Sequence, residues 1–266
     1  MFIIKNHMRI SFVPFLSMGI MTIILFAIGL IPASYLLITA MMWILISGLG
    51  ISAGYHRVFS HRTHSLPTWA ENIILFFATF AGQGGPIFWV ALHRGYHHPH
   101  ADTKKDLHSP IAFSKYVAFM GWFSASAKNT VHPKYAVDLL RKPNFLWFQK
   151  YHYKILWVVP LLVSIIDWKI ALAAFFLPCA LGSLQDNLVN VFGHIKGWIG
   201  YRNFETNDNS QNNALLGYFA WGQGWHNNHH YNPKSYDFGK GVSGNRWEWD
   251  PSTIFLPILN FLNKNK

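Results

Sequence analysis

The chain alternates between long apolar stretches without charge and polar stretches rich in histidine. Residues 10–55 contain no Asp, Glu, Lys, Arg or His, and this length fits two transmembrane helices of about 20 residues each. Pro32 lies within this stretch. Because proline favours turns, we place the turn between the two helices there. The pattern therefore predicts one helix near 12–31 and a second near 34–54.

A second pair of spans is predicted in the second half of the chain, at 147–166 and 170–190, joined by the short turn Asp167-Trp168-Lys169. The charge-free run 72–92 is broken by a Gly-rich turn that ends at Pro86. It is more typical of a re-entrant or interfacial helical segment than of a span. We expect an all-α integral membrane protein with four transmembrane helices in two hairpins, and a surface helix over 254–262.

Charge decides the orientation of these spans. Only 12% of the residues are charged, about half the share in soluble domains. With four spans, all of the 22 Lys and Arg residues except Lys169 fall on one side of the membrane, which the positive-inside rule makes cytoplasmic. The net charge of +11 then needs no nucleic acid. We expect one membrane domain over 1–266, with termini and a helical cap (55–146 and 191–266) in the cytoplasm, in a bacterial inner membrane.

Nine of the 15 histidines gather at predicted membrane boundaries. They lie in the segments 54–62 (GYHRVFSHR), 93–98 (HRGYHH) and 224–230 (GWHNNHH), with one more after the last span in 190–194 (NVFGH). Residues three and four apart share a helix face, so the histidines of 224–230 converge. His56 and His61 are five apart and would not share a face on an α-helix, so the helix ends there or the site lies between them.

Clustered neutral imidazoles are good ligands for iron, zinc, copper or nickel. Nine ligands are too many for one ion and suit two. Zinc favours four-coordinate sites, so iron with positions open for oxygen is the best fit, although ligand type alone leaves other metals open. A histidine-rich metal transporter is a remote alternative. It would need ligands near the middle of the bilayer, where no predicted span carries an acidic residue.

The sequence resembles the membrane fatty acid desaturases, in particular the acyl-CoA (delta-9, stearoyl-CoA-type) branch in its bacterial form without a fused cytochrome domain. The matching motifs are 54–62, 89–94 (WVALHR), 102–110, 190–194, 201–213, 224–230 and 247–250 (WEWD). The resemblance implies a four-helix membrane anchor and a cytoplasmic cap that holds a non-haem di-iron centre. By motif position the ligands would be His56, His61, His93, His97, His98, His194, His226, His229 and His230, with Asn190 acting through a bound water.

The activity that the resemblance implies is O₂-dependent insertion of a cis double bond into a saturated acyl chain, with two ferrous ions as cofactor. Acyl-CoA is the first expected substrate, and a carrier-protein thioester or an acyl lipid stays open. A hydroxylase of the same superfamily is the close alternative. No electron-carrier motif is visible, so electrons would come from a separate ferredoxin, rubredoxin or b-type cytochrome with its reductase.

Two positions depart from the family pattern. The second box has one residue more than the usual His-Arg-x-His-His, which leaves His100 as an alternative to His93, and Gln223 stands where the family has Glu. Supporting groups that would orient the imidazoles are Asp102, Asp106, Asp186, Asp208 and Gln223. For Asp186, a plain salt bridge at the end of the helix is the alternative interpretation. Candidates for the wall of an acyl tunnel are Trp89, Trp122, Phe123 and Trp221, for which ordinary packing or an interfacial aromatic belt is the alternative.

Overall fold

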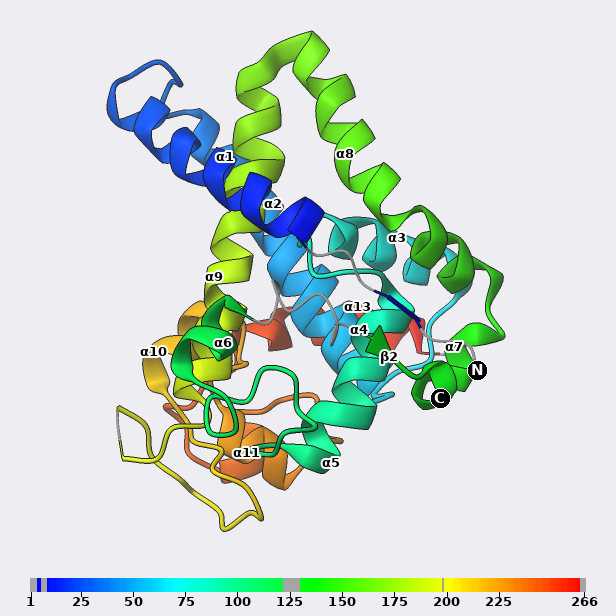
Figure 1. Cartoon of the computed structure of the whole chain (residues 1–266), viewed down its shortest axis with the longest axis vertical. Helices are drawn as coiled ribbons and strands as arrows, with labels where there is room; N and C mark the ends of the chain where they lie inside the picture. The colour runs from blue at the N-terminus through cyan, green and yellow to red at the C-terminus, as the bar shows by residue number, and fades with distance from the viewer. Residues whose placement is uncertain (1–3, 6–8, 122–129, 198, 264–266) are drawn as a thin grey trace.

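The structure is a computed structural model that describes residues 4–5, 9–121, 130–197 and 199–263 (Figure 1). It is mostly helical. The first half contains β1 (Ile4–Lys5), α1 (Arg9–Ala27), α2 (Tyr35–Trp43), the π-helix η1 (Ile44–Ser60), α3 (Thr68–Thr79), α4 (Pro86–Leu92), the π-helix η2 (His93–His97), α5 (His98–His100) and α6 (Lys115–Phe119).

The second half begins with β2 (Thr130–Val131), which pairs antiparallel with β1. There follow η4 (Pro133–Ala136), α7 (Val137–Leu140), α8 (Pro143–Ala171), the π-helix η5 (Leu172–Phe176), α9 (Leu177–Phe192), α10 (Ala214–Phe219), α11 (His226–Tyr231), α12 (Lys240–Ser243), η6 (Pro251–Phe255) and α13 (Leu256–Leu262).

Two helical hairpins project from one end of the molecule, as Figure 1 shows with α1 and α2 in blue and α8 and α9 in green. The second hairpin turns at Asp167, whose φ of −153° and ψ of 109° are not helical. The two turns meet, because the Tyr35 hydroxyl donates to Asp167 Oδ2 at 2.8 Å. The predicted turn at 167–169 is therefore present, and it is tied to the first hairpin.

Small residues let the hairpin helices approach closely. A Cβ atom on Gly19 of α1 would lie 2.4 Å from Cβ of Ala180 on α9, and one on Gly182 would lie 2.4 Å from Oγ of Ser47 on η1. Such contacts are the usual way for apolar helices to pack in lipid, where burying apolar surface gives no advantage. The same helices expose large apolar side chains outward, up to 86% exposure for Ile166.

In the part of the chain that the structure describes, two helical stretches are long and apolar enough to cross a membrane, Tyr35–Ser60 and the hairpin Pro143–Phe192. Helices occupy all four predicted span positions, with shifted ends. The first ends at Ala27 instead of 31, the second continues to Ser60 instead of 54, and α8 begins at Pro143 instead of 147. Because the helix extends to Ser60, His56 lies within it and not in a following loop.

The broken segment 72–92 forms two helices, as its Gly-rich turn predicts. α3 ends at Thr79 and α4 starts at Pro86. The open N-terminus of α4 is capped from another element, because Gln149 Oε1 on α8 accepts hydrogen bonds from the backbone N–H groups of Ile87 and Phe88 at 2.9 and 3.1 Å. α4 leads directly into η2, so this cap fixes the approach of the second histidine box.

A fully buried ion pair fastens the C-terminal segment to the end of η1. Arg57 Nη2 lies 2.6 Å from Asp250 Oδ2, and both side chains have no exposed surface. Arg57 also donates to the carbonyl oxygens of Tyr236 and Ser52, and Asp250 accepts from the Phe238 backbone N–H at 2.9 Å. Because each charge is paired and hydrogen-bonded, the pair can exist in the interior.

Replacing one partner of this pair should be strongly destabilising. Asp250→Asn leaves the Arg57 guanidinium buried without its counter-charge, at a cost of about 3–5 kcal/mol, and should lower the thermal unfolding midpoint in detergent by roughly 10 °C. The matched control is Asp138→Asn, because Asp138 pairs with Arg62 and Arg94 but is 38% exposed and should contribute less than about 1 kcal/mol. Equal unfolding midpoints for the two variants would contradict the claim that the buried Arg57–Asp250 pair contributes more to stability than the exposed pairs of Asp138.

Candidate metal centre

The turns that carry the first two histidine boxes are wound as π-helix, in which the N–H of residue i+5 bonds to the C=O of residue i. The His61 N–H donates to the His56 carbonyl at 3.1 Å, and the His98 N–H donates to the His93 carbonyl. Residues five apart therefore share a face in both boxes. This winding explains how His56 and His61, five residues apart, can face the same site. It also lets His93 and His98 share a face although the second box has one additional residue.

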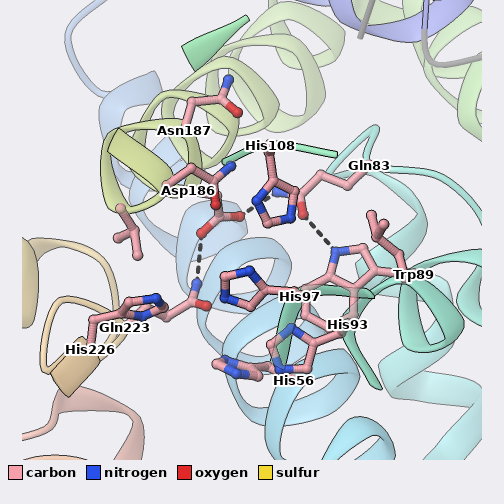
Figure 2. A pocket seen from close by; sticks show the side chains of 13 residues that line it. His56, Gln83, Trp89, His93, His97, His108, Asp186, Asn187, Gln223 and His226 are labelled. Carbon is pink, nitrogen blue, oxygen red and sulfur yellow. Dashed lines mark hydrogen bonds between the residues drawn. The ribbon is translucent and has the colours of Figure 1, made fainter. Parts of the chain in front are cut away.

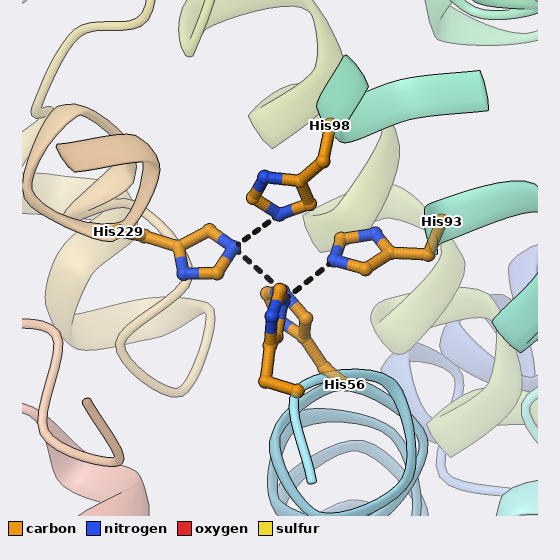
Figure 3. A group of neighbouring side chains, drawn as sticks. His56, His93, His98 and His229 are labelled. Atoms are coloured by element: carbon orange, nitrogen blue, oxygen red, sulfur yellow. Dashed lines mark hydrogen bonds between the residues drawn. The ribbon is translucent and has the colours of Figure 1, made fainter. Parts of the chain in front are cut away.

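Five of the histidines form one group, here called the first group: His56, His61, His93, His98 and His229. Their available ring nitrogens all lie within 4.8 Å of one another. The Nε2 atom of His229 lies 3.0 Å from that of His56 and 2.9 Å from that of His98. Figure 3 shows these rings pointing toward a common centre from separate parts of the fold.

The remaining four form the second group: His97, His194, His226 and His230. The Nε2 atoms of His194 and His226 lie 2.9 Å apart. Neighbours in sequence are divided between the groups, because His97 joins the second group while His98 joins the first, and His230 joins the second while His229 joins the first. The two groups are therefore adjacent and share the same two short segments. His100 belongs to neither group.

Carboxylates meet the outer nitrogen of three rings in the second group. Asp208 Oδ2 lies 2.6 Å from His230 Nδ1, Asp106 Oδ2 lies 3.0 Å from His97 Nδ1, and Asp102 Oδ1 lies 3.2 Å from His194 Nδ1. Asp106 and Asp208 hydrogen-bond their rings and thereby favour the tautomer with hydrogen on Nδ1, which leaves Nε2 as the available donor atom, whereas Asp102 lies beside His194 without hydrogen-bond geometry. The structure thus places three of the predicted supporting carboxylates beside imidazoles.

Asp186 and Gln223 have a different arrangement. Asp186 accepts hydrogen bonds from two carboxamides, Gln83 Nε2 and Gln223 Nε2, the second at 2.6 Å. Gln83 Oε1 in turn accepts from Trp89 Nε1 at 2.9 Å. Among the residues that the structure describes, no cation pairs with Asp186, so the salt-bridge interpretation of this residue is not what the fold shows.

This carboxamide network lines part of a cavity of about 70 Å³ that reaches both histidine groups (Figure 2). The lining comprises His56 and His93 of the first group, His97 and His226 of the second, and also Gln83, Trp89, Leu92, His108, Asp186, Asn187, Val189, Asn190 and Gln223. The cavity is therefore the place where a small molecule could meet both groups at once.

The predicted tunnel residues are divided by the structure. Trp89 lines the cavity and stacks on His93 with ring centroids 5.1 Å apart. Trp221 instead packs against Trp43 and over Gly48. Trp122 and Phe123 lie outside the described residues.

Five residues of the cavity lining are not among the predicted site residues, namely Gln83, Leu92, His108, Asn187 and Val189. His108 lies beside Asp106, with its Nδ1 3.3 Å from Asp106 Oδ1, and Gln83 lies in the Gly-rich turn between α3 and α4. For His108 a signal existed, because it falls inside the motif 102–110. A single glutamine in a turn carries no comparable signal.

Burial keeps most of these rings neutral. Burial lowers the pKa of His61 to about 3, and it lowers the pKa values of His93, His98 and His229 well below the usual range. For His97, burial opposes the charged form, but Asp106 together with Asp208 and Asp102 outweighs burial and raises its pKa. The first group therefore presents neutral imidazoles at pH 7, which is the form that binds metal.

The chain matches the family model described as "Fatty acid desaturase" over residues 23–238. The chain belongs to the fatty acid desaturase family. It is 33% identical over 234 residues to the sn-2 palmitoyl-lipid 9-desaturase of Nostoc sp. (strain 36), covering 84% of this chain and 77% of that protein. It is 30% identical over 228 residues to the sn-1 stearoyl-lipid 9-desaturase of Anabaena variabilis, covering 85% and 80%.

A plant relative, the Delta-9 acyl-lipid desaturase 2 of Arabidopsis thaliana, is 34% identical over 197 residues, covering 70% of this chain and 60% of that protein. Membership of the desaturase family is thus confirmed. The expected acyl-CoA branch is not supported to the same degree, because these relatives are named as lipid desaturases. Two long apolar helices and the desaturase family together indicate association with a membrane.

The lowered pKa values predict that this desaturase, freed of metal, loses stability in mild acid. Unfolded histidines take up protons below about pH 6.5 while the buried rings do not, so each such ring costs about 1.4 kcal/mol per pH unit. Unfolding of the metal-free protein in detergent, compared at pH 6.5 and 5.5, should show a clear loss at the lower pH. His61→Gln should reduce that loss, and an unchanged loss would contradict the role of burial.

Proposed function

We propose that each histidine group of this desaturase holds one iron ion. Neutral imidazoles whose ring nitrogens face one another at about 3 Å repel through their lone pairs unless a hydrogen or a cation lies between them. Five rings cannot all share hydrogens around one point, whereas a divalent cation bound to all of them removes the repulsion. Imidazole suits iron, and five such ligands exceed the four that zinc prefers.

The reaction that we infer is O₂-dependent formation of a cis double bond in a saturated acyl chain, with the two irons supplying the oxygen chemistry that removes two hydrogens. The chain's own residues position this chemistry. Asp106 and Asp208 hold rings of the second group by hydrogen bonds at Nδ1, and Asp102 lies beside Nδ1 of His194. Asn190 lines the cavity beside His226, where it could hold a metal-bound water.

The substrate that we propose is the acyl chain of a membrane lipid, desaturated at position 9. The names of the relatives from Nostoc, Anabaena and Arabidopsis support both points. An acyl-CoA or a carrier-protein thioester is the alternative. A lipid substrate fits a site at the base of two apolar hairpins, because its chain can enter from the bilayer without leaving an apolar environment.

We also propose that α1, α2 with η1, α8 and η5 with α9 are the four membrane spans, and that the histidine end is cytoplasmic. The outward apolar side chains of the hairpins support this arrangement. The expected placement of 21 of the 22 Lys and Arg residues on the side of the histidine boxes supports the cytoplasmic orientation. A separate electron donor, a ferredoxin, rubredoxin or b-type cytochrome, would then reach the site from the cytoplasm.

Metal content tests the proposed centre. Protein purified after iron-replete expression should hold two irons per chain by elemental analysis. His229→Ala removes a ring that contacts two other rings of the first group, so the iron content should fall and turnover should drop at least 100-fold. His64→Ala is the matched control, because His64 bonds to Thr63 and Asn260 and belongs to neither group. Full activity of His229→Ala would overturn the ligand assignment.

Product analysis tests the reaction and the substrate. Membrane lipids of cells that express the chain should gain a cis double bond at position 9, located by mass spectrometry of derivatised fatty acids, and cells expressing His229→Ala should not. Purified protein with a reduced electron donor should act on a lipid bearing a saturated chain faster than on the matching acyl-CoA. A hydroxylated chain without unsaturation would refute desaturation, and a preference for acyl-CoA would refute the lipid substrate alone.

A further inference from the structure

The two histidine groups have unequal electrostatic surroundings. Three of the four rings in the second group have a carboxylate oxygen within 3.2 Å of Nδ1, namely Asp102, Asp106 and Asp208. Among the described residues, no carboxylate forms such a contact with any of the five rings of the first group. Their surroundings are aromatic instead: His93 stacks on Trp89, and His229 packs on Phe238 with centroids 4.0 Å apart.

A charge-neutral ion pair, by contrast, lies behind the first group. The Arg57 guanidinium stands 3.7 Å from the centroid of the Phe238 ring, on which His229 and His56 also pack. Its charge is shared with Asp250, so the pair contributes no net negative charge here. The first group thus offers a cation five neutral ligands, whereas the second group offers four ligands and three nearby negative charges.

We propose that the second group binds its metal ion more tightly than the first and retains it when the first group is empty. This inference rests on the proposed two-iron centre. A carboxylate on the outer nitrogen raises the basicity of an imidazole and fixes its ring, and losing one such partner typically costs about 10- to 100-fold in metal affinity. Two such hydrogen-bonded partners, Asp106 and Asp208, together with the nearby Asp102 carboxylate, outweigh the single additional neutral imidazole of the first group, and all three negative charges attract the cation directly.

Stepwise removal of iron tests this order. Anaerobic ferrous protein with two irons per chain is equilibrated with rising concentrations of a chelator, and the retained iron is counted. Iron should leave in two steps at chelator concentrations at least tenfold apart. Asp208→Asn should move the later step about 10- to 100-fold toward lower chelator and leave the earlier step in place. Asp102→Asn is the second variant with the same expectation, should Asp208→Asn fail to fold.

Two further variants identify the steps. His61→Ala disrupts the first group, so the earlier step should disappear and the later one remain. Asp138→Asn removes a carboxylate that pairs with Arg62 and Arg94 instead of an imidazole, and neither step should move. The Mössbauer doublet that survives half-depletion of the unaltered protein should match the doublet of His61→Ala.

The outcomes separate the two proposals. Release of both irons in a single step, or a shift of the earlier step by Asp208→Asn, would overturn the unequal binding and leave the two-iron centre standing. Protein that takes up no iron at all would overturn the centre and the inference together.

Discussion

The arrangement of the molecule depends on one constraint, which is that nine clustered imidazoles, six of them buried, must face one another while most of them stay neutral. Two ring nitrogens that lie about 3 Å apart cannot both belong to protonated rings, because like charges at that separation in a dry interior are strongly repelled. Burial keeps the first group neutral, and bound cations would remove the remaining lone-pair repulsion. The surrounding fold has to hold the rings in place while it keeps water out.

Rigid elements meet this demand. The histidines of the two groups lie on η1, η2, α5 and α11 or within two residues after η1 and α9, and packing away from the rings fixes these elements. The small residues of the hairpins let α1, η1 and α9 approach, and Gln149 caps α4 just before the second box. The buried Arg57–Asp250 pair holds the C-terminal segment so that Phe238 covers two rings. A site carried by helix ends is held more precisely than one carried by loops.

The sequence was sufficient for the helices and for the membership of the histidine clusters, because charge-free runs and dense histidine boxes are strong local signals. It was insufficient for the division into five and four. His97 and His98 are neighbours that serve different groups, and this division follows from π-winding, which leaves no hydrophobic periodicity to read. The second helix, predicted to end near residue 54, continues as π-helix to Ser60. Gln83 was missed because its role exists only after a turn and two distant helices meet.

The Gln at position 223, where the resembling family has Glu, is best understood together with Asp186. Gln223 Nε2 donates to Asp186 Oδ1 at 2.6 Å, and Gln83 donates to the other carboxylate oxygen. A glutamate at 223 would put two carboxylates at hydrogen-bond distance, which disfavours ionisation of both. The carboxamide supplies a donor instead, so the cavity contains one carboxylate satisfied on both oxygens. Gln223 therefore suits the Asp186 carboxylate, which accepts a hydrogen bond on each oxygen.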